Sequence, residues 1–180
     1  MTNCYLVISG GQLSIIDPGG DVKDILREIN KTKAKPKYII NTHGHWDHTL
    51  GNKIIKKITG AKILIHEAEK DFIKPAPYRT GGSGAGFKVD KFLKDGDKIK
   101  IGETILKVIY TPGHTRGSIC LSDKDFVFTG DTLFKDGQGR TDLPGGSEKD
   151  LKKSLEKLKK ILKPGITVYP GHGEIFKVKK

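Results

Sequence analysis

The stretch Thr-His-Gly-His-Trp-Asp-His at residues 42–48 holds three of the six histidines of the chain. It directly follows Tyr38–Asn41, a short apolar run that predicts a buried strand. In a tight loop, His43 and His45 can point one way while Asp47 and His48 reach a second position beside them. We therefore expect a metal site with room for two adjacent ions.

Three later turns also begin where a predicted strand ends, and each carries a residue type that binds metal ions. They are Pro112–His114, Gly130–Asp131 and Pro170–Gly173. With residues 42–48 they contain five of the six histidines, which scattered structural histidines would not produce. Imidazole and carboxylate ligands suit zinc best, and iron and manganese accept the same ligand set. The sixth histidine, His66, ends another predicted strand, and we assign it a structural role.

Strand and helix patterns alternate along the chain. Strands are expected at 4–9, 13–17, 38–41, 61–66, 98–101, 104–111, 117–121, 125–129 and 166–169. Helices are expected at 21–30, 50–58 and 67–74 and from Ser147, the last with a stripe of Leu151, Leu155, Leu158 and Leu162. The Gly- and Pro-rich segment 75–86 predicts a loop. These patterns predict an α/β fold of four layers in a single domain, residues 1–180.

The charge balance favours an anionic small-molecule substrate. The net charge of +12 comes from 33 Lys and Arg against 21 Asp and Glu. Much of the excess lies on the expected outer face of the last helix, as solvated lysines usually do. There is no run of about 20 apolar residues and no signal-peptide pattern, so we expect a cytoplasmic protein without a membrane span. Cys4 and Cys120 lie in apolar runs and are expected to be buried thiols.

The four turns together resemble the signature of the metallo-β-lactamase superfamily. Beside residues 42–48, the matching elements are Thr-Pro-Gly-His-Thr-Arg-Gly-Ser at 111–118, Thr-Gly-Asp-Thr-Leu-Phe at 129–134 and Pro-Gly-His-Gly at 170–173. The resemblance runs over almost the whole chain. It implies a four-layer αββα sandwich with two metal ions at one edge, between the two sheets.

The resemblance also implies the ligands of these ions. They divide into His43, His45 and His114 for one ion, Asp47, His48 and His172 for the other, and Asp131 as the bridge between them. Asp17 matches an early aspartate of the family that supports a ligand histidine. The alternative role for Asp17 is to form a turn before Pro18.

Residues Gly139–Pro144, Gly-Arg-Thr-Asp-Leu-Pro, resemble the glyoxalase II-like thioesterases and the related persulfide dioxygenases. Both act on glutathione-type thiols. We therefore expect hydrolysis of an anionic thioester such as S-lactoylglutathione by a metal-bound hydroxide, with Asp47 orienting it and Asp131 essential. Arg140 is expected to bind a substrate carboxylate, or else to order its own loop with Asp142.

The resemblance leaves the substrate and three rival functions open. The best-known glyoxalase II enzymes bind glutathione with a C-terminal helical region, whereas only 174–180 follow the last motif, which matches a compact branch. A persulfide dioxygenase would use a single iron with ligands of the His43, His114 and Asp131 type. A lactonase or β-lactamase would share the two-metal ligands. A nucleic-acid-binding nuclease is the weakest rival. The acyl group, the thiol, the metal and the oligomeric state are not readable from the sequence.

Overall fold

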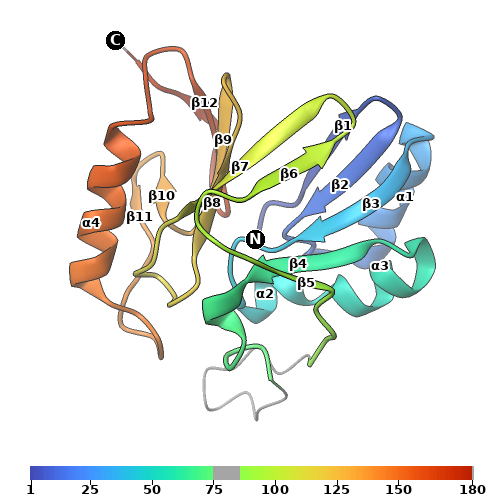
Figure 1. Cartoon of the computed structure of the whole chain (residues 1–180), viewed down its shortest axis with the longest axis horizontal. Coiled ribbons are helices and arrows are strands. Elements are labelled where there is room, and N and C mark those ends of the chain that lie inside the picture. Colours follow the sequence, from blue (N-terminus) through green and yellow to red (C-terminus); the bar gives the residue numbers. More distant parts are fainter. Residues whose placement is uncertain (75–85, 180) are drawn as a thin grey trace.

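Two β-sheets form the centre of the protein (Figure 1). The structure, a computed structural model, describes residues 1–74 and 86–179. The first sheet has the strand order β1-β2-β3-β4-β5, in which only β1 and β2 are antiparallel to each other. Its strands are β1 (Tyr5–Ser9), β2 (Gln12–Ile16), β3 (Lys35–Ile40), β4 (Lys62–His66) and β5 (Lys91–Leu93).

The second sheet has the order β13-β12-β9-β8-β7-β6, with β12 and β9 as its parallel pair. Its strands are β6 (Lys98–Ile101), β7 (Thr104–Tyr110), β8 (Ile119–Ser122), β9 (Phe126–Gly130), β12 (Thr167–Pro170) and β13 (Phe176–Lys177). A separate short hairpin is formed by β10 (Leu133–Phe134) and β11 (Gly137–Gln138).

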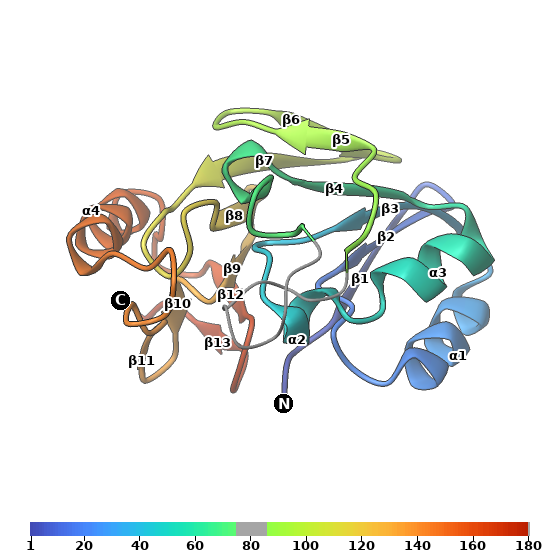
Figure 2. The ribbon, with the colours of Figure 1, turned by 90° about the horizontal axis from the view of Figure 1, so that it is seen from below.

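Helices cover the outer faces of the two sheets (Figure 2). Helices α1 (Val22–Thr32) and α3 (Asn52–Thr59) lie against the first sheet, and α4 (Glu148–Lys159) lies against the second. Asp21 and Ser147 cap α1 and α4, as expected, by accepting hydrogen bonds from backbone amides of the first turn. The short helix α2 (Trp46–Thr49) and the 3₁₀ turn η1 (Glu67–Glu69) follow β3 and β4.

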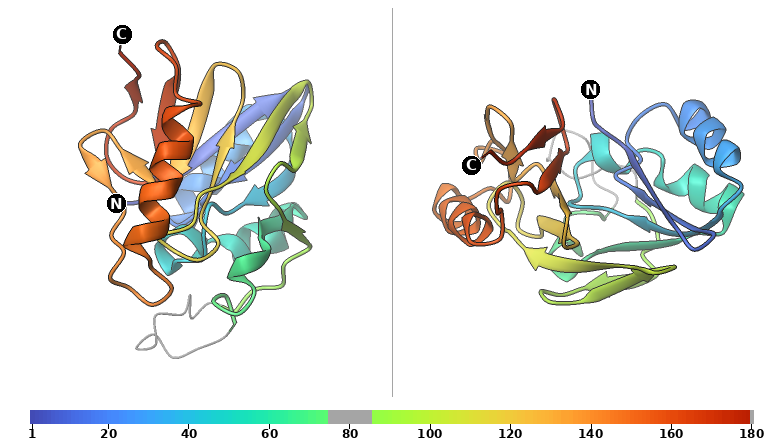
Figure 3. Two further views of the ribbon diagram at one scale, coloured as in Figure 1. Left: turned by 60° about the vertical axis from the view of Figure 1, so that its left-hand side comes forward. Right: turned by 90° about the horizontal axis from the view of Figure 1, so that it is seen from above.

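Three apolar layers hold these elements together. Side chains from both sheets meet in the central layer, with Ile40, Leu106 and Ile119 fully buried there. In the second layer, strand side chains pack against Ile29 of α1 and Ile55 of α3. In the third layer, Leu158 of α4 packs against the other sheet. Figure 3 shows the same order of helix, sheet, sheet and helix from two further directions. The expected four-layer αββα fold is confirmed.

The structure corrects the sequence prediction at several places. The helix expected at 67–74 is only the 3₁₀ turn Glu67–Glu69 followed by turns, because the Glu69 side chain is drawn into the interior. Strands β5, β10, β11 and β13 were not predicted, since runs of two or three residues carry no clear alternation. The loop predicted at 75–86 lies outside the described residues except for Gly86.

Strand ends bring the motif loops together at one edge of the sandwich. The parallel pairing of β12 with β9 places Pro170 opposite Gly130, so that the residues following each strand lie side by side. The 42–48 loop follows β3 in the facing sheet, and Thr42 connects the sheets because its carbonyl accepts from the Ile119 amide at 2.9 Å. This edge therefore collects the four motif loops, as other α/β folds place ligands at the carboxyl ends of their strands.

The remaining expectations concern the cysteines and the membrane. Cys4 and Cys120 are both free thiols, and burial raises the pKa of Cys4 to about 12 and that of Cys120 to about 11. Such thiols are unreactive at neutral pH. Among the described residues, no helix combines the length and the apolar character needed to cross a bilayer.

Candidate metal site

Seven side chains from the four motif loops converge within reach of shared metal ions. Their nitrogen and oxygen atoms form three overlapping groups in which all donor atoms lie within 4.8 Å of one another. The groups are His43, His45 and His114; His43, His48 and Asp131; and Asp47, His48 and His172. These are the seven residues expected as ligands, and the structure brings all of them together.

The first cluster consists of His43, His45 and His114. His114 Nε2 lies 2.8 Å from His45 Nδ1, and the His43 ring centroid is 4.7 Å from that of His45 and 4.8 Å from that of His114. His43 is fully buried, and its Nε2 has no hydrogen-bond partner in the described part of the chain. A buried nitrogen without a hydrogen-bond partner among other imidazoles fits the role of a metal ligand.

The second cluster consists of Asp47, His48 and His172. His48 Nε2 lies 3.3 Å from His172 Nε2, and Asp47 Oδ2 lies 3.3 Å from His172 Nε2. This cluster is more open than the first, because Asp47 and His172 are half-buried while His48 is fully enclosed. It therefore forms the solvent-facing half of the site.

Asp131 lies between the two clusters, in the position expected of a bridge. Its Oδ2 is 3.4 Å from both His114 Nε2 and His172 Nε2, and its Oδ1 is 3.4 Å from His48 Nε2. The Oδ1 atom is buried and has no hydrogen bond of normal geometry to any residue that the structure describes. Gly171 makes this packing feasible, because a Cβ there would come within 2.2 Å of Asp131 Oδ1.

Asp17 orients His48 directly, and His43 through Thr42, by hydrogen bonds to the ring nitrogens that face away from the cluster. Its Oδ2 lies 3.0 Å from His48 Nδ1 and accepts from Thr42 Oγ1 at 2.6 Å, while its Oδ1 accepts from the Thr42 amide. Because the Thr42 hydroxyl proton is used on Asp17, its oxygen is left to accept from His43 Nδ1 at 3.1 Å. These contacts place the protons of His43 and His48 on Nδ1. The first of the two roles considered for Asp17, support of a ligand histidine, matches this geometry.

Backbone carbonyls orient two further histidines by hydrogen bonds to their Nδ1 atoms. His114 Nδ1 lies 2.7 Å from the carbonyl of Arg140, and His172 Nδ1 lies 3.1 Å from the carbonyl of Met1. Four of the five histidines thus present Nε2 lone pairs to the centre, and His45 presents Nδ1. Such outer partners are the usual support of metal-ligating histidines. The side chains therefore fit divalent ions bound at both clusters.

The two clusters differ in the protons they hold without metal. Burial lowers the pKa of His43 well below its usual range and that of His45 to about 4, and it also lowers the pKa of His114. Burial opposes a proton on His48 as well, but Asp17 and Asp131 outweigh it and raise the pKa to about 10. Hydrogen bonding to Asp131 and Asp47 raises the pKa of His172 to about 9.

Both carboxyl groups stay ionised. Burial would raise the pKa of Asp47, yet His172, His48 and Thr2 lower it to about 2. The pKa of Asp131 is held far below its usual range, because the surrounding imidazoles, led by His172 and His48, outweigh its burial. With five histidines, two of which lose a proton when a metal ion binds, these two carboxylates complete a ligand set for divalent cations.

The guanidinium of Arg140 is engaged within its own loop. It donates to both oxygens of Asp142, at 2.7 Å from Nε and 2.5 Å from Nη2, and both side chains are about two-thirds exposed. The alternative role considered for Arg140, ordering its own loop, matches this pair. The expected contact with a substrate carboxylate stays a prediction, and it would have to compete with Asp142.

His66 lies outside all three groups of candidate ligands. Its ring stacks on Tyr110 with a centroid distance of 4.4 Å, and its Nδ1 accepts from the Ala68 amide at the start of η1. The expected structural role is confirmed.

Glu69 is a supporting residue that the sequence analysis missed. It is fully buried between the two loops that carry the first cluster, and burial raises its pKa. Its Oε1 accepts from Thr115 Oγ1 at 2.5 Å and from the Gly117 amide at 2.7 Å. Gly44 and Gly117 leave the space for this carboxylate, since a Cβ at either position would meet Glu69 atoms at 2.5 Å or less. A glutamate three residues after a strand gives no sequence signal for this role.

The first residues of the chain form a second support that the sequence did not reveal. Thr2 Oγ1 donates to Asp47 Oδ2 at 2.8 Å, and Thr2 pairs as an isolated bridge with His172. The Asn3 side-chain amide donates to the carbonyls of Pro170 and Gly173. The segment before β1 thus orients two members of the second cluster.

The different pKa values of the clusters predict different proton release on metal binding. At pH 7, His48 and His172 hold protons because their pKa values are raised, so an ion entering the second cluster displaces about two protons. The first cluster is already neutral and releases close to none. Affinity of the second site should therefore rise with pH towards pH 9, by up to about 100-fold per unit, while that of the first site stays flat above pH 7.

Isothermal titration calorimetry of the metal-free protein with Zn²⁺, in buffers of different ionisation enthalpy, measures this release. Equal proton release for both ions would contradict the prediction.

Truncating Glu69 tests whether its carboxylate holds the first cluster. Glu69→Ala leaves the Thr115 hydroxyl and the Gly117 amide without their acceptor, and it should lower the free energy of unfolding by about 2–4 kcal/mol. It should also weaken binding of the first ion in a chelator competition. The control is Glu67→Ala, because Glu67 lies on the same turn and its ion pair with Lys94 is exposed. Equal urea midpoints for the two variants would refute this role.

Comparison with known proteins agrees with this geometry. The family model of the Metallo-beta-lactamase superfamily matches residues 1–172. An uncharacterized protein of Mycobacterium tuberculosis is 37% identical, with 95% of this chain and 85% of the relative covered. A probable metallo-hydrolase of Bacillus subtilis, YqgX, is 33% identical over 95% and 84% of the two chains. A probable polyketide biosynthesis zinc-dependent hydrolase of Bacillus velezensis, BaeB, is 32% identical over 94% and 72%.

Solved structures share the fold over nearly the whole chain. The di-iron-bound form of TTHA1623 has 29% identity and a TM-score of 0.85, with 98% of this chain and 90% of that chain covered. The B3 metallo-beta-lactamase BLEG-1 has 27% identity and a TM-score of 0.85 over 98% and 88%. ETHE1 from Myxococcus xanthus has 27% identity and a TM-score of 0.81 over 98% and 74%. The chain therefore belongs to the Metallo-beta-lactamase superfamily and is a metal-dependent hydrolase of that superfamily.

Proposed function

We propose that this hydrolase cleaves an anionic thioester, of which S-lactoylglutathione is one example, with two divalent ions, most often zinc, at the clusters described above. The observation that carries the proposal is Asp131, whose two oxygens lie at 3.4 Å from histidines of both clusters. One carboxylate shared by two complete ligand sets supports a site for a pair of ions. When bound, such a pair supplies Lewis-acid charge and lowers the pKa of coordinated water.

The residues of the chain itself prepare the remaining steps. Asp47 is ionised at neutral pH, because its pKa is about 2, and its Oδ2 is held by Thr2. It can therefore accept a hydrogen bond from the attacking water and fix its direction. A thiolate is a good leaving group and needs little help from a general acid, which suits a site built of anionic and neutral groups.

The loop after Asp131 supports the choice of a thioester within the superfamily. Residues Gly139–Pro144 carry the motif that resembles glyoxalase II-like thioesterases, and they lie against the ligands. The Arg140 carbonyl supports His114, and a Cβ on Gly139 would lie 1.9 Å from the Asp131 carbonyl oxygen. The motif therefore supports the candidate ligands His114 and Asp131 through its backbone.

Changing the bridging residue tests the mechanism. Asp131→Asn keeps the size of the side chain but removes its charge, so we expect thioester turnover to fall by about 100-fold or more while the fold stays intact. Circular dichroism checks the fold, elemental analysis counts the bound metal, and release of free thiol measures turnover. Retained turnover in Asp131→Asn would sink the mechanism.

A substrate panel separates the proposal from its rivals. Protein purified without added metal is analysed for zinc, iron and manganese and then assayed with S-lactoylglutathione, simple acyl thioesters, a lactone and a β-lactam. Oxygen consumption with glutathione persulfide and a single bound iron would identify a persulfide dioxygenase instead. RNA retention that weakens with salt would indicate the nuclease. The cytoplasmic location expected from the sequence remains a prediction.

A further inference from the structure

Arg116 is a cation beside the metal site whose charged group is not engaged. It lies two residues after the ligand His114, and its side chain is exposed. Its backbone is fixed, because the Arg116 carbonyl accepts from Tyr110 Oη at 2.8 Å. Within residues 1–74 and 86–179, the guanidinium has neither a hydrogen bond nor an ion pair. It differs in this from Arg140, which is bound to Asp142.

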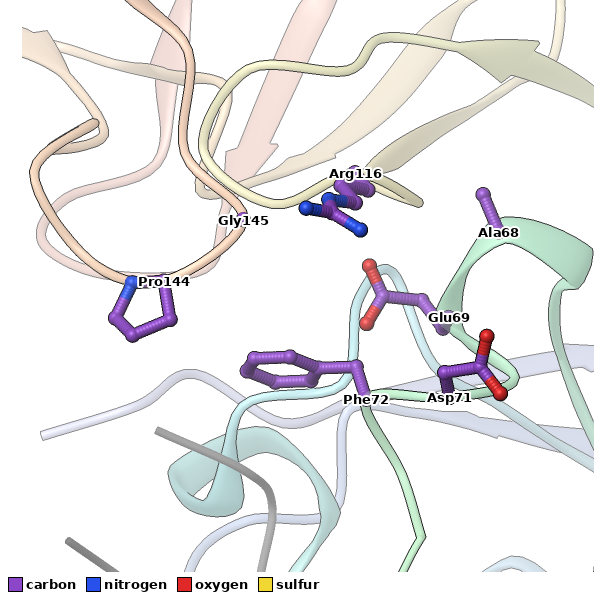
Figure 4. Close-up of a pocket in the computed structure, with 7 residues that line it drawn as sticks. All are labelled: Ala68, Glu69, Asp71, Phe72, Arg116, Pro144 and Gly145. Carbon is purple, nitrogen blue, oxygen red and sulfur yellow. The ribbon is translucent and has the colours of Figure 1, made fainter. Parts of the chain in front are cut away.

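The guanidinium faces a recess of about 260 Å³ (Figure 4). Three segments that are distant in sequence line it: the turn from Ala68 to Phe72, Arg116, and the end of the motif loop at Pro144 and Gly145. The Phe72 ring, the Pro144 ring and the Ala68 methyl group give the recess an apolar wall. A single cation at the rim of an apolar recess suits an amphipathic ligand.

The recess borders the first metal cluster. The Phe72 ring packs edge-on against the His45 ring at a centroid distance of 5.4 Å. Glu69, in the floor of the recess, bonds to Thr115, which directly follows the ligand His114. A substrate held at the metal centre can therefore extend along Phe72 towards Arg116 without leaving the protein surface.

The acidic groups of the recess do not cancel the charge of Arg116. Asp71 pairs with Lys74 at 2.7 Å, and this contact, together with the nearby charges of Lys70 and Arg116, lowers the pKa of Asp71. Glu69 is fully buried beneath the surface, and burial raises its pKa; its Oε1 accepts from Thr115 and Gly117, and its Oε2 has no hydrogen-bond partner among the described residues. What the recess presents to a ligand is thus a planar guanidinium beside apolar surface. Such a fork matches a carboxylate in geometry and charge.

We propose that Arg116 is the specificity-determining residue of this enzyme and binds the carboxylate of the substrate, with the apolar stem of that group lying against Phe72 and Pro144. The inference rests on the proposed thioesterase function and deepens it. It assigns the substrate anion to Arg116 rather than to Arg140. The carboxylate can belong to the thiol or to the acyl part of the thioester, and the experiment separates these sources.

Two matched pairs of thioesters provide the kinetic test. S-acetyl-3-mercaptopropionate and its methyl ester differ only in a carboxylate on the thiol side, and mono-S-ethyl thioglutarate and its methyl ester differ only in one on the acyl side. The zinc-loaded wild-type enzyme should prefer the anion of one pair. The measured quantity is the ratio of kcat/KM for the anion to kcat/KM for its methyl ester. Arg116→Ala should lower this ratio by about 10-fold, through KM, and Arg116→Lys should lower it less.

Two further variants serve as controls. Lys70→Ala removes a nearby positive charge that does not line the recess, and it should leave the ratio unchanged. A fall in the ratio for Lys70→Ala as large as that for Arg116→Ala would show general electrostatic attraction and overturn the assignment. A fall for Arg140→Ala with none for Arg116→Ala would place the carboxylate at Arg140 instead. Metal content and the thermal midpoint of Arg116→Ala should equal those of the wild type.

A binding measurement keeps the inference separate from the proposed reaction. 3-Mercaptopropionate, 6-mercaptohexanoate and their methyl esters are titrated into the zinc-loaded protein by calorimetry. If no thioester is cleaved but a free carboxylate strengthens binding in the wild type and not in Arg116→Ala, the thioesterase proposal fails and the carboxylate site stands. If the wild type binds acids and methyl esters equally, or if Arg116→Ala keeps the preference, the inference is overturned.

Discussion

The carboxylate of Asp131 is the constraint on which the rest of this site depends. It is buried among histidines of both clusters, at 3.4 Å from three of their nitrogens, and the protonated second cluster is what keeps it ionised in the absence of metal. A buried carboxylate needs compensating positive charge. The same positions can therefore compensate the Asp131 carboxylate either with protons on His48 and His172 or with divalent ions.

The αββα fold exists around this site because each ligand loop leaves the end of a strand. Pairing of β12 with β9 places the loops of Asp131 and His172 together, while β3 of the facing sheet brings in the 42–48 loop. A fully apolar layer between the sheets keeps these strand ends at a constant distance. The positions of the ligand side chains are therefore fixed by the packing of Ile40, Leu106 and Ile119 as well as by the loops themselves.

Several residues that are not candidate ligands hold the site together by positioning the ligand side chains. Asp17 fixes His48 and, through Thr42, His43, and Glu69 ties the His43–His45 loop to the loop of His114. The same turn that carries Glu69 also carries Phe72, which forms the wall between the metal centre and the recess of Arg116. The short segment 69–72 therefore both holds the first cluster in place and shapes the neighbouring recess.

The sequence by itself determined the candidate ligands and the architecture. His43, His45, Asp47, His48, His114, Asp131 and His172 follow strands in a spacing that specifies the superfamily, and apolar periodicity predicted the long strands and α1 and α4. Only the tertiary structure decided which oxygen supports each histidine, because Asp17, the Met1 carbonyl and the Arg140 carbonyl are brought to the site by long-range packing. It also showed that Arg140 pairs with Asp142, whereas the Arg116 guanidinium, which has no ion pair within residues 1–74 and 86–179, lies beside an apolar recess. The physical reason is that a ligand motif is local in sequence, whereas the neighbours of a charged side chain are set by segments that meet only in the folded chain.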